Sequence, residues 1–284
     1  MKQILILSGK GGTGKTVITG SFAAIAKNKV MVDCDVDAAD LHLLLQPTVK
    51  ERHEFKSGQT AVINSKFCHR CGRCLEVCRF KAITTSLIVE PFSCEGCKLC
   101  SYICPNNAIT MKENIAGEWF VSDTKYGSFV HAKLGVAEEN SGKLVAKIRQ
   151  VATDLARQQQ SDYVIIDGPP GIGCPVIASL SGVDVALIIT EPTLSGLHDA
   201  KRVIELANHF KIPVKMVINK YDLNPHMSNQ IEVFCIQHKV PMIGKIPFDK
   251  AIVESMVKGI PIVEHVSGTV KEELFKIWDE IKKF

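Results

Sequence analysis

Eight of the 11 cysteines in this 284-residue chain fall into two runs with the same spacing. Thiolates are ligands for soft metals, so closely spaced cysteines indicate a metal site. The similarity continues beyond the last cysteine of each run, where Ala82-Ile83 is repeated as Ala108-Ile109. This internal repeat predicts two pseudo-symmetric halves that pack face to face. The runs are Cys68-x-x-Cys71-x-x-Cys74-x-x-x-Cys78 and Cys94-x-x-Cys97-x-x-Cys100-x-x-x-Cys104-Pro105.

Each run resembles the cysteine pattern of bacterial two-cluster ferredoxins, in which three thiolates of a run bind one [4Fe–4S] cluster and the fourth binds the other cluster. A structural zinc site and a disulfide framework are the alternatives. Zinc sites use paired Cys-x-x-Cys units and four ligands, so eight thiolates in two tight runs favour two clusters. The resemblance implies one cluster on Cys68, Cys71, Cys74 and Cys104, and a second on Cys94, Cys97, Cys100 and Cys78.

A glycine-rich segment near the start of the chain could bind phosphate. It fits the pattern G-x-x-x-x-G-K-[ST], in which glycines let backbone N–H groups approach the phosphates. Lys15 would reach the β and γ oxygens of a nucleotide, and the Thr16 hydroxyl would bind Mg²⁺. The segment follows the apolar stretch 3–8 and precedes a helical pattern, which is the context that such a loop needs. Its residues are Gly9, Lys10, Gly11, Gly12, Thr13, Gly14, Lys15 and Thr16.

With its additional lysine, Lys10, this segment resembles the deviant Walker motif of the MinD/Mrp/ParA superfamily, which includes the nitrogenase iron protein. The resemblance implies ATP and Mg²⁺ as cofactors. It also implies a homodimer that forms with ATP, because the early lysine of that family crosses the dimer interface to the partner's nucleotide.

Further motifs extend this resemblance along the chain. Asp33-Cys34-Asp35 is similar to the family's switch I, which implies that Asp35 positions the attacking water. Asp167-Gly168-Pro169-Pro170-Gly171 is similar to switch II, which implies that Asp167 acts on Mg²⁺ together with Thr16. Asn219 resembles the adenine-reading asparagine, and Pro247 lies in a segment like the late base-contacting loop. The implied catalytic residues are Lys10, Lys15, Asp35 and Asp167.

Outside the cysteine runs, apolar strands alternate with helical patterns. This order predicts an α/β fold with a doubly wound, mainly parallel sheet. We expect an ATPase domain formed by residues 1–60 and 114–284, with an inserted α+β two-cluster ferredoxin domain at 61–113. The helical pattern that ends the chain favours docking on the core over membrane binding. The expected strands are 3–8, 29–33, 163–167, 183–190, 214–219 and 242–246; the expected helices are 16–27, 141–160, 195–210 and 226–239.

Three cysteines lie outside the runs. We expect Cys34 and Cys235 to be small buried hydrophobic residues. Cys174 follows Asp167 by seven residues, as a cluster-binding cysteine of the nitrogenase iron protein follows its switch II aspartate. A bridging cluster and a structural role remain open for Cys174.

Composition limits the possible partners and compartments. The net charge of +4 does not argue for nucleic acid, so none is expected as a partner. No apolar run reaches the length of a transmembrane segment. Eleven cysteines without a signal peptide favour a reducing cytoplasm.

The sequence supports three hypotheses about function. The main one is an ATPase that couples nucleotide-driven dimer switching to electron transfer through two [4Fe–4S] clusters, with a redox partner protein. The second is an iron–sulfur assembly or carrier ATPase that serves an acceptor protein. The third is a spatial-positioning ATPase whose ferredoxin docks a partner.

Overall fold

The computed structural model describes residues 1–135 and 140–284. The chain forms two compact units. We call them the sheet unit (Met1–His53, Trp119–Lys133 and Ser141–Phe284) and the cysteine unit (Glu54–Glu118 and Leu134–Asn140). The chain passes between them in two long strands, β3 (Thr48–Ile63) and β4 (Ile109–Thr124).

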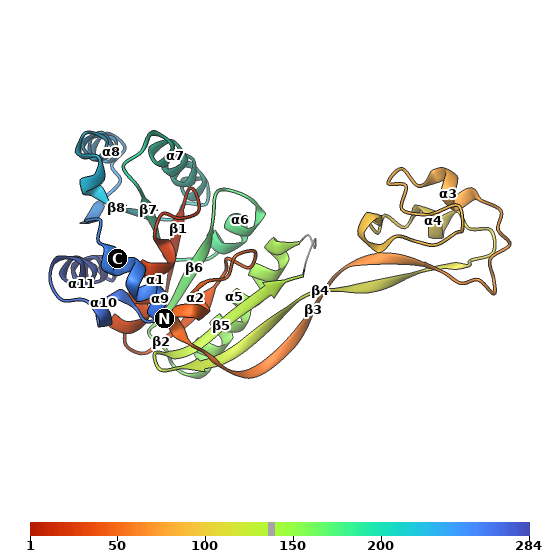
Figure 1. Cartoon of the computed structure of the whole chain (residues 1–284), viewed down its shortest axis with the longest axis horizontal. Helices are drawn as coiled ribbons and strands as arrows, with labels where there is room; N and C mark the ends of the chain where they lie inside the picture. The colour runs from red at the N-terminus through yellow and green to blue at the C-terminus, as the bar shows by residue number, and fades with distance from the viewer. Residues whose placement is uncertain (136–139) are drawn as a thin grey trace. The chain divides into compact units, whose positions relative to one another are not determined.

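The predicted mainly parallel sheet is present, with nine strands in the order β3-β4-β5-β2-β6-β1-β7-β8-β9 (Figure 1). The strands from β5 to β9 along this order pair in parallel. Their central members are continuous apolar runs, as expected for strands that are covered on both faces. The remaining strands are β1 (Lys2–Ser8), β2 (Lys29–Asp33), β5 (Gly127–Leu134), β6 (Tyr163–Pro170), β7 (Val185–Thr190), β8 (Val214–Asn219) and β9 (Met242–Ile246).

Helices cover both faces of this sheet (Figure 1). On one face, alternate strand residues such as Ile4, Ile6 and Ile165 pack with apolar residues of α1, α2, α10 and α11. On the other face, α5, α6 and α7 pack against the strands. The helices of the sheet unit are α1 (Lys15–Ile25), α2 (Leu41–Leu45), α5 (Ser141–Gln158), α6 (Cys174–Leu180), α7 (Leu194–His209), α8 (Pro225–Gln237), α9 (Lys250–Lys258), α10 (Ile262–His265) and α11 (Thr269–Ile281).

The last helix, α11, docks on the core as predicted. Its apolar face is buried, and the Trp278 ring lies 5.3 Å from the rings of both Phe22 and Tyr163. Within the described ranges, no helix is both long enough and apolar enough to cross a membrane.

The cysteine unit repeats its backbone conformation as well as its sequence. Helix α3 (Arg73–Val77) and helix α4 (Leu99–Tyr102) begin 26 residues apart, and each follows a residue with positive φ, Gly72 or Lys98. Two further pairs at the same offset also have positive φ: Arg70 with Gly96, and Lys81 with Asn107. Because two different sequences adopt these uncommon conformations at equivalent positions, the repeat is structural.

Candidate functional site

The glycine-rich segment joins the end of β1 to the start of α1, as predicted. Gly12 and Gly14 have φ values of 78° and 91°, which favour glycine. Gly14 also allows a close approach, since a Cβ there would lie 2.3 Å from the Asn219 amide nitrogen. The segment lines a cavity at the carboxyl edge of the sheet, where parallel α/β proteins bind ligands. This phosphate-loop cavity is lined by Ser8, Gly11, Gly12, Thr13, Gly14, Lys15, Thr16, Val17, Asp35, Ala38, Asp40, Pro170 and Met256.

Asp167 brings together the two residues that begin α1. Its carboxylate accepts hydrogen bonds from Lys15 Nζ at 2.9 Å and from the Thr16 hydroxyl at 2.8 Å. The Thr19 hydroxyl donates a third bond at 2.9 Å. Asp167 is 1% exposed, so these bonds stabilise a buried charge. Thr16 and Asp167 are therefore adjacent, as two oxygen ligands of one Mg²⁺ must be.

Burial and charge perturb the neighbouring ionisable groups. Burial alone would lower the pKa of Lys15, but the carboxylates of Asp167, Asp33 and Asp35 outweigh it and raise that pKa above its usual value. Burial raises the pKa of Asp35 to about 6, although Lys15 Nζ, 3.8 Å from its carboxylate, acts in the opposite direction. A carboxyl group with this pKa changes charge close to neutral pH, as acid–base residues of active sites often do.

Asp33 holds the backbone of the loop that carries Asp35, a role that was not predicted from the sequence. It is fully buried at the end of β2, and its carboxylate accepts backbone bonds from Asp35 at 3.0 Å and Leu41 at 3.2 Å. Burial, followed by repulsion from Asp167, raises the pKa of Asp33 well above its usual value. Asp33 therefore fixes the backbone that carries Asp35.

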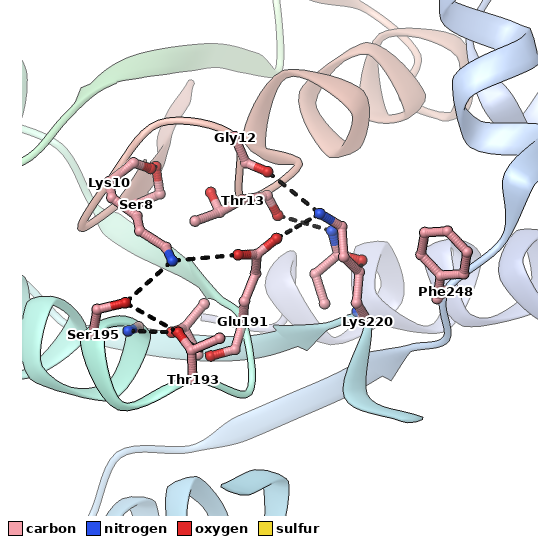
Figure 2. Close-up of polar contacts among 12 residues, drawn as sticks. Ser8, Lys10, Gly12, Thr13, Glu191, Thr193, Ser195, Lys220 and Phe248 are labelled. Carbon is pink, nitrogen blue, oxygen red and sulfur yellow. Dashed lines mark hydrogen bonds and ion pairs between the residues drawn. The ribbon is translucent and has the colours of Figure 1, made fainter. Parts of the chain in front are cut away.

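Lys10 does not line the phosphate-loop cavity and is held by residues beyond the end of β7 (Figure 2). Its Nζ lies 3.5 Å from the Glu191 carboxylate and 3.3 Å from the Ser195 hydroxyl. Glu191 also pairs with Lys220 at 2.5 Å, and Figure 2 shows it between the two lysines. Glu191 and Lys220 were not predicted as site residues; their only signal in the sequence is that each is a charged residue directly after an apolar strand.

Asn219 and Pro247 also lie outside the residues that line that cavity. Asn219 is 4% exposed; its amide donates to the Thr13 carbonyl at 2.8 Å and accepts from the Lys220 backbone at 3.0 Å. It therefore joins the end of β8 to the phosphate loop. Pro247 follows β9, and the next residue, Phe248, donates its N–H to Asp222 at 2.7 Å.

The cysteine unit contains two small cavities, each lined by four cysteines drawn from both runs. Apolar residues form much of the remaining lining, among them Ile63 and Leu87 in the first cavity and Ala61 and Val77 in the second. The first cavity contains Cys68, Cys71, Cys74 and Cys104, and the second contains Cys94, Cys97, Cys100 and Cys78.

The fourth cysteine of each run also has a repeated environment. The Cys78 sulfur accepts the Ala82 N–H at 3.3 Å, and the Cys104 sulfur accepts the Ala108 N–H at 3.3 Å. Hydrogen bonds to sulfur tune the potentials of iron–sulfur clusters. The thiol donors, apolar walls and N–H donors together fit a thiolate-bound cluster in each cavity.

The alternatives for these cysteines find less support in the geometry. All 11 cysteines are described and are free thiols, which does not agree with a disulfide framework. Zinc requires its sulfurs about 2.3 Å from one point. Among residues 1–135 and 140–284, no group of three or more His, Cys, Asp or Glu side chains could hold a single metal ion.

Comparison with known proteins identifies the family. Residues 4–262 match the model of the CobQ/CobB/MinD/ParA nucleotide binding domain. The chain belongs to this family. The matched residues include the glycine-rich segment between β1 and α1, so this segment lies within the nucleotide binding domain of the family.

Similar proteins cover nearly the whole chain. An uncharacterized protein of Methanocaldococcus jannaschii is 34% identical over 99% of this chain and 97% of its own length. An iron–sulfur cluster carrier protein of Pyrococcus furiosus is 27% identical over 92% of this chain and 79% of its own length. The solved structure of the septum site-determining protein MinD with Mg-ADP, from Pyrococcus horikoshii, has a TM-score of 0.60 at 18% identity, covering 99% of this chain and 96% of that one.

The remaining cysteines of this family member differ in exposure. Cys34 and Cys235 are buried, as predicted, and burial raises the pKa of Cys235 to about 11. Cys174 is exposed at the first position of α6.

Proposed function

We propose that the protein is an ATP-binding and ATP-hydrolysing iron–sulfur protein, in which nucleotide-driven dimer switching is coupled to electron transfer. The observation that carries this proposal is the pair of cavities, each lined by four cysteines from both runs. We assign residues 61–113 as the inserted ferredoxin domain and residues 1–60 and 114–284 as the ATPase domain. Bound there, the two [4Fe–4S] clusters would supply one-electron transfer.

The residues of the phosphate-loop cavity would share the work of hydrolysis. Thr16 and Asp167 would hold Mg²⁺, which would neutralise phosphate charge when bound. Lys15 would bind the β and γ phosphates in exchange for part of its contact with Asp167. Asp35 would orient the attacking water, held in place by the backbone bonds to Asp33. Asn219 and Pro247 would define the adenine side of the site.

Two copies of the chain would close on ATP through Lys10. This part rests on the resemblance of Lys10 to the interface lysine of the family, and on its position outside its own phosphate-loop cavity. Closure would change the loop that carries Asp35. The same loop precedes β3, through which the chain enters the cysteine unit. A redox partner protein would then receive the electron.

The test measures cofactor content and coupling in one preparation. Anaerobically purified protein should contain about eight iron atoms per chain. A cluster potential should differ between ADP and a non-hydrolysable ATP analogue, and the reduced and oxidised forms should differ in ATP affinity by the same free energy. A 59 mV shift in a one-electron couple would correspond to about a tenfold change in affinity.

The Lys10→Ala variant is the control for this experiment. It should retain its iron but lose both the shift in potential and the ATP-dependent dimer. Equal potentials with both nucleotides in the wild-type protein would contradict coupling. Stoichiometric zinc with little iron would contradict the clusters themselves.

A second candidate function is an iron–sulfur cluster carrier ATPase. The relative from Pyrococcus furiosus with that name, at 27% identity over 92% of this chain, favours it. Transfer of clusters to an apo-protein, without ATP-dependent reduction of an acceptor, would support this function. Spatial positioning is the third candidate. A patterned distribution of the protein on a surface, independent of redox state, would support it.

A further inference from the structure

Lys10 is held to its own chain by two contacts. Its ammonium group lies 3.5 Å from Glu191 Oε2 and 3.3 Å from the Ser195 hydroxyl, and its side chain is 34% exposed (Figure 2). The segment that carries Ser195 is itself ordered, because the Thr193 hydroxyl accepts the Gly196 N–H at 2.9 Å at the start of α7. Lys10 must leave both contacts before it can reach a second copy of the chain.

Glu191 cannot follow Lys10 outward. It lies directly after Thr190, the buried last residue of β7, and its side chain is 15% exposed. Its other oxygen pairs with Lys220 at 2.5 Å, and Lys220 Nζ lies 3.5 Å from the Gly12 carbonyl oxygen. The carboxylate therefore lies between two cations, Lys10 and Lys220, and pairs with both.

We propose that Glu191 is a positioning residue that holds Lys10 in a resting state, and that its carboxylate competes with ATP phosphate for this lysine when two copies pair. The inference rests on the proposed function of Lys10 in the dimer. Glu191 does not line the phosphate-loop cavity, so its effect on the dimer is exerted through Lys10. Its presence makes ATP-dependent dimerisation weaker than the phosphate contact alone would allow.

The decisive variant is Glu191→Gln, which keeps the shape of the side chain and removes its charge. The first readout is the rate at which sulfo-NHS-acetate acetylates Lys10 in the nucleotide-free monomer, measured by mass spectrometry. We expect about a threefold faster rate, because loss of the ion pair frees the Lys10 amine from its own chain and leaves it more accessible to the reagent. This readout does not depend on dimerisation.

The second readout is the apparent Kd of the ATP-dependent dimer, measured by sedimentation with a non-hydrolysable ATP analogue. We expect Kd to fall by about fivefold for each lysine released, since a partly exposed ion pair contributes up to about 1 kcal/mol. Ser195→Ala removes the weaker contact and should change both readouts in the same direction, by less. Glu232→Gln, which removes an ion pair to Lys245 on the opposite side of β8, is the matched control and should change neither.

The outcomes separate this inference from the proposed function. An unchanged rate of Lys10 acetylation in Glu191→Gln would overturn this inference, whatever the measured Kd of the dimer. Faster acetylation with a weaker or unchanged dimer would also overturn it, because Glu191 would then not compete with nucleotide. A wild-type protein that stays monomeric with the ATP analogue would instead overturn the proposed function.

Discussion

At the scale of single residues, the raised pKa of Asp35 lowers the stability of the folded chain at neutral pH. Its pKa is raised from 3.8 to about 6, so the folded chain binds this proton more tightly than the unfolded chain does. The ionised carboxyl therefore destabilises the nucleotide-free protein above pH 6, and the penalty disappears as pH falls from 6 towards 4. Asp35→Asn should raise the melting temperature at pH 7.5 by about 2 °C, corresponding to about 1 kcal/mol, and by little at pH 4.

The exposed carboxylate of Asp37, two residues further on, provides the matched control. Asp37→Asn should leave the melting temperature nearly unchanged at both pH values. Asp35→Asn should still bind ATP but hydrolyse it slowly, because water positioning matters mainly in the transition state. A melting temperature that falls equally at pH 7.5 and pH 4 would show that Asp35 contributes to stability through its contacts rather than its charge.

At the scale of elements, the phosphate loop is built against helix α7. A Cβ added to Gly9 would lie 2.3 Å from the Asp199 Cβ and 2.7 Å from the Asp199 carbonyl carbon, which belongs to the backbone. A Cβ added to Gly11, in the same loop, would meet nothing within 4 Å. Gly9→Ala should therefore lower the free energy of unfolding by about 2 kcal/mol through overpacking, and Gly11→Ala by much less. Chemical denaturation of both variants tests this difference, and equal losses would show that α7 moves away without cost.

At the scale of the whole molecule, the two cysteine runs depend on each other. If the clusters are shared as the two cavities suggest, Cys71→Ala and Cys104→Ala should each remove the same cluster, although the residues belong to different runs. Cys97→Ala and Cys78→Ala should each remove the other cluster. Each variant should retain about four iron atoms, and the potential of the remaining cluster identifies which one was lost. Grouping of Cys104 with Cys97 instead would show that each run binds its own cluster.

Several features of this protein follow from the sequence alone because their signals are local. The phosphate loop is a continuous motif, and the strands β1, β2, β8 and β9 are largely apolar segments whose bounds were predicted to within one residue. The docking face of α11 is visible as a helical period of apolar residues, and the cysteine repeat is visible as a constant offset. In each case neighbouring residues carry enough information to identify the element.

The tertiary structure decided the features that depend on residues far apart in the chain. Strands β3, β4 and β5 were not predicted, because β3 and β4 are largely polar and long, and their pairing rather than their composition makes them strands. The contacts of Asp33 with the loop that carries Asp35 depend on how that loop folds back over the strand end. Glu191 reaches both Lys10 and Lys220 because β1, β7 and β8 are neighbours in the sheet, so their carboxyl ends meet at one edge. Strand order is a property of the whole sheet, and no local pattern in the sequence specifies it.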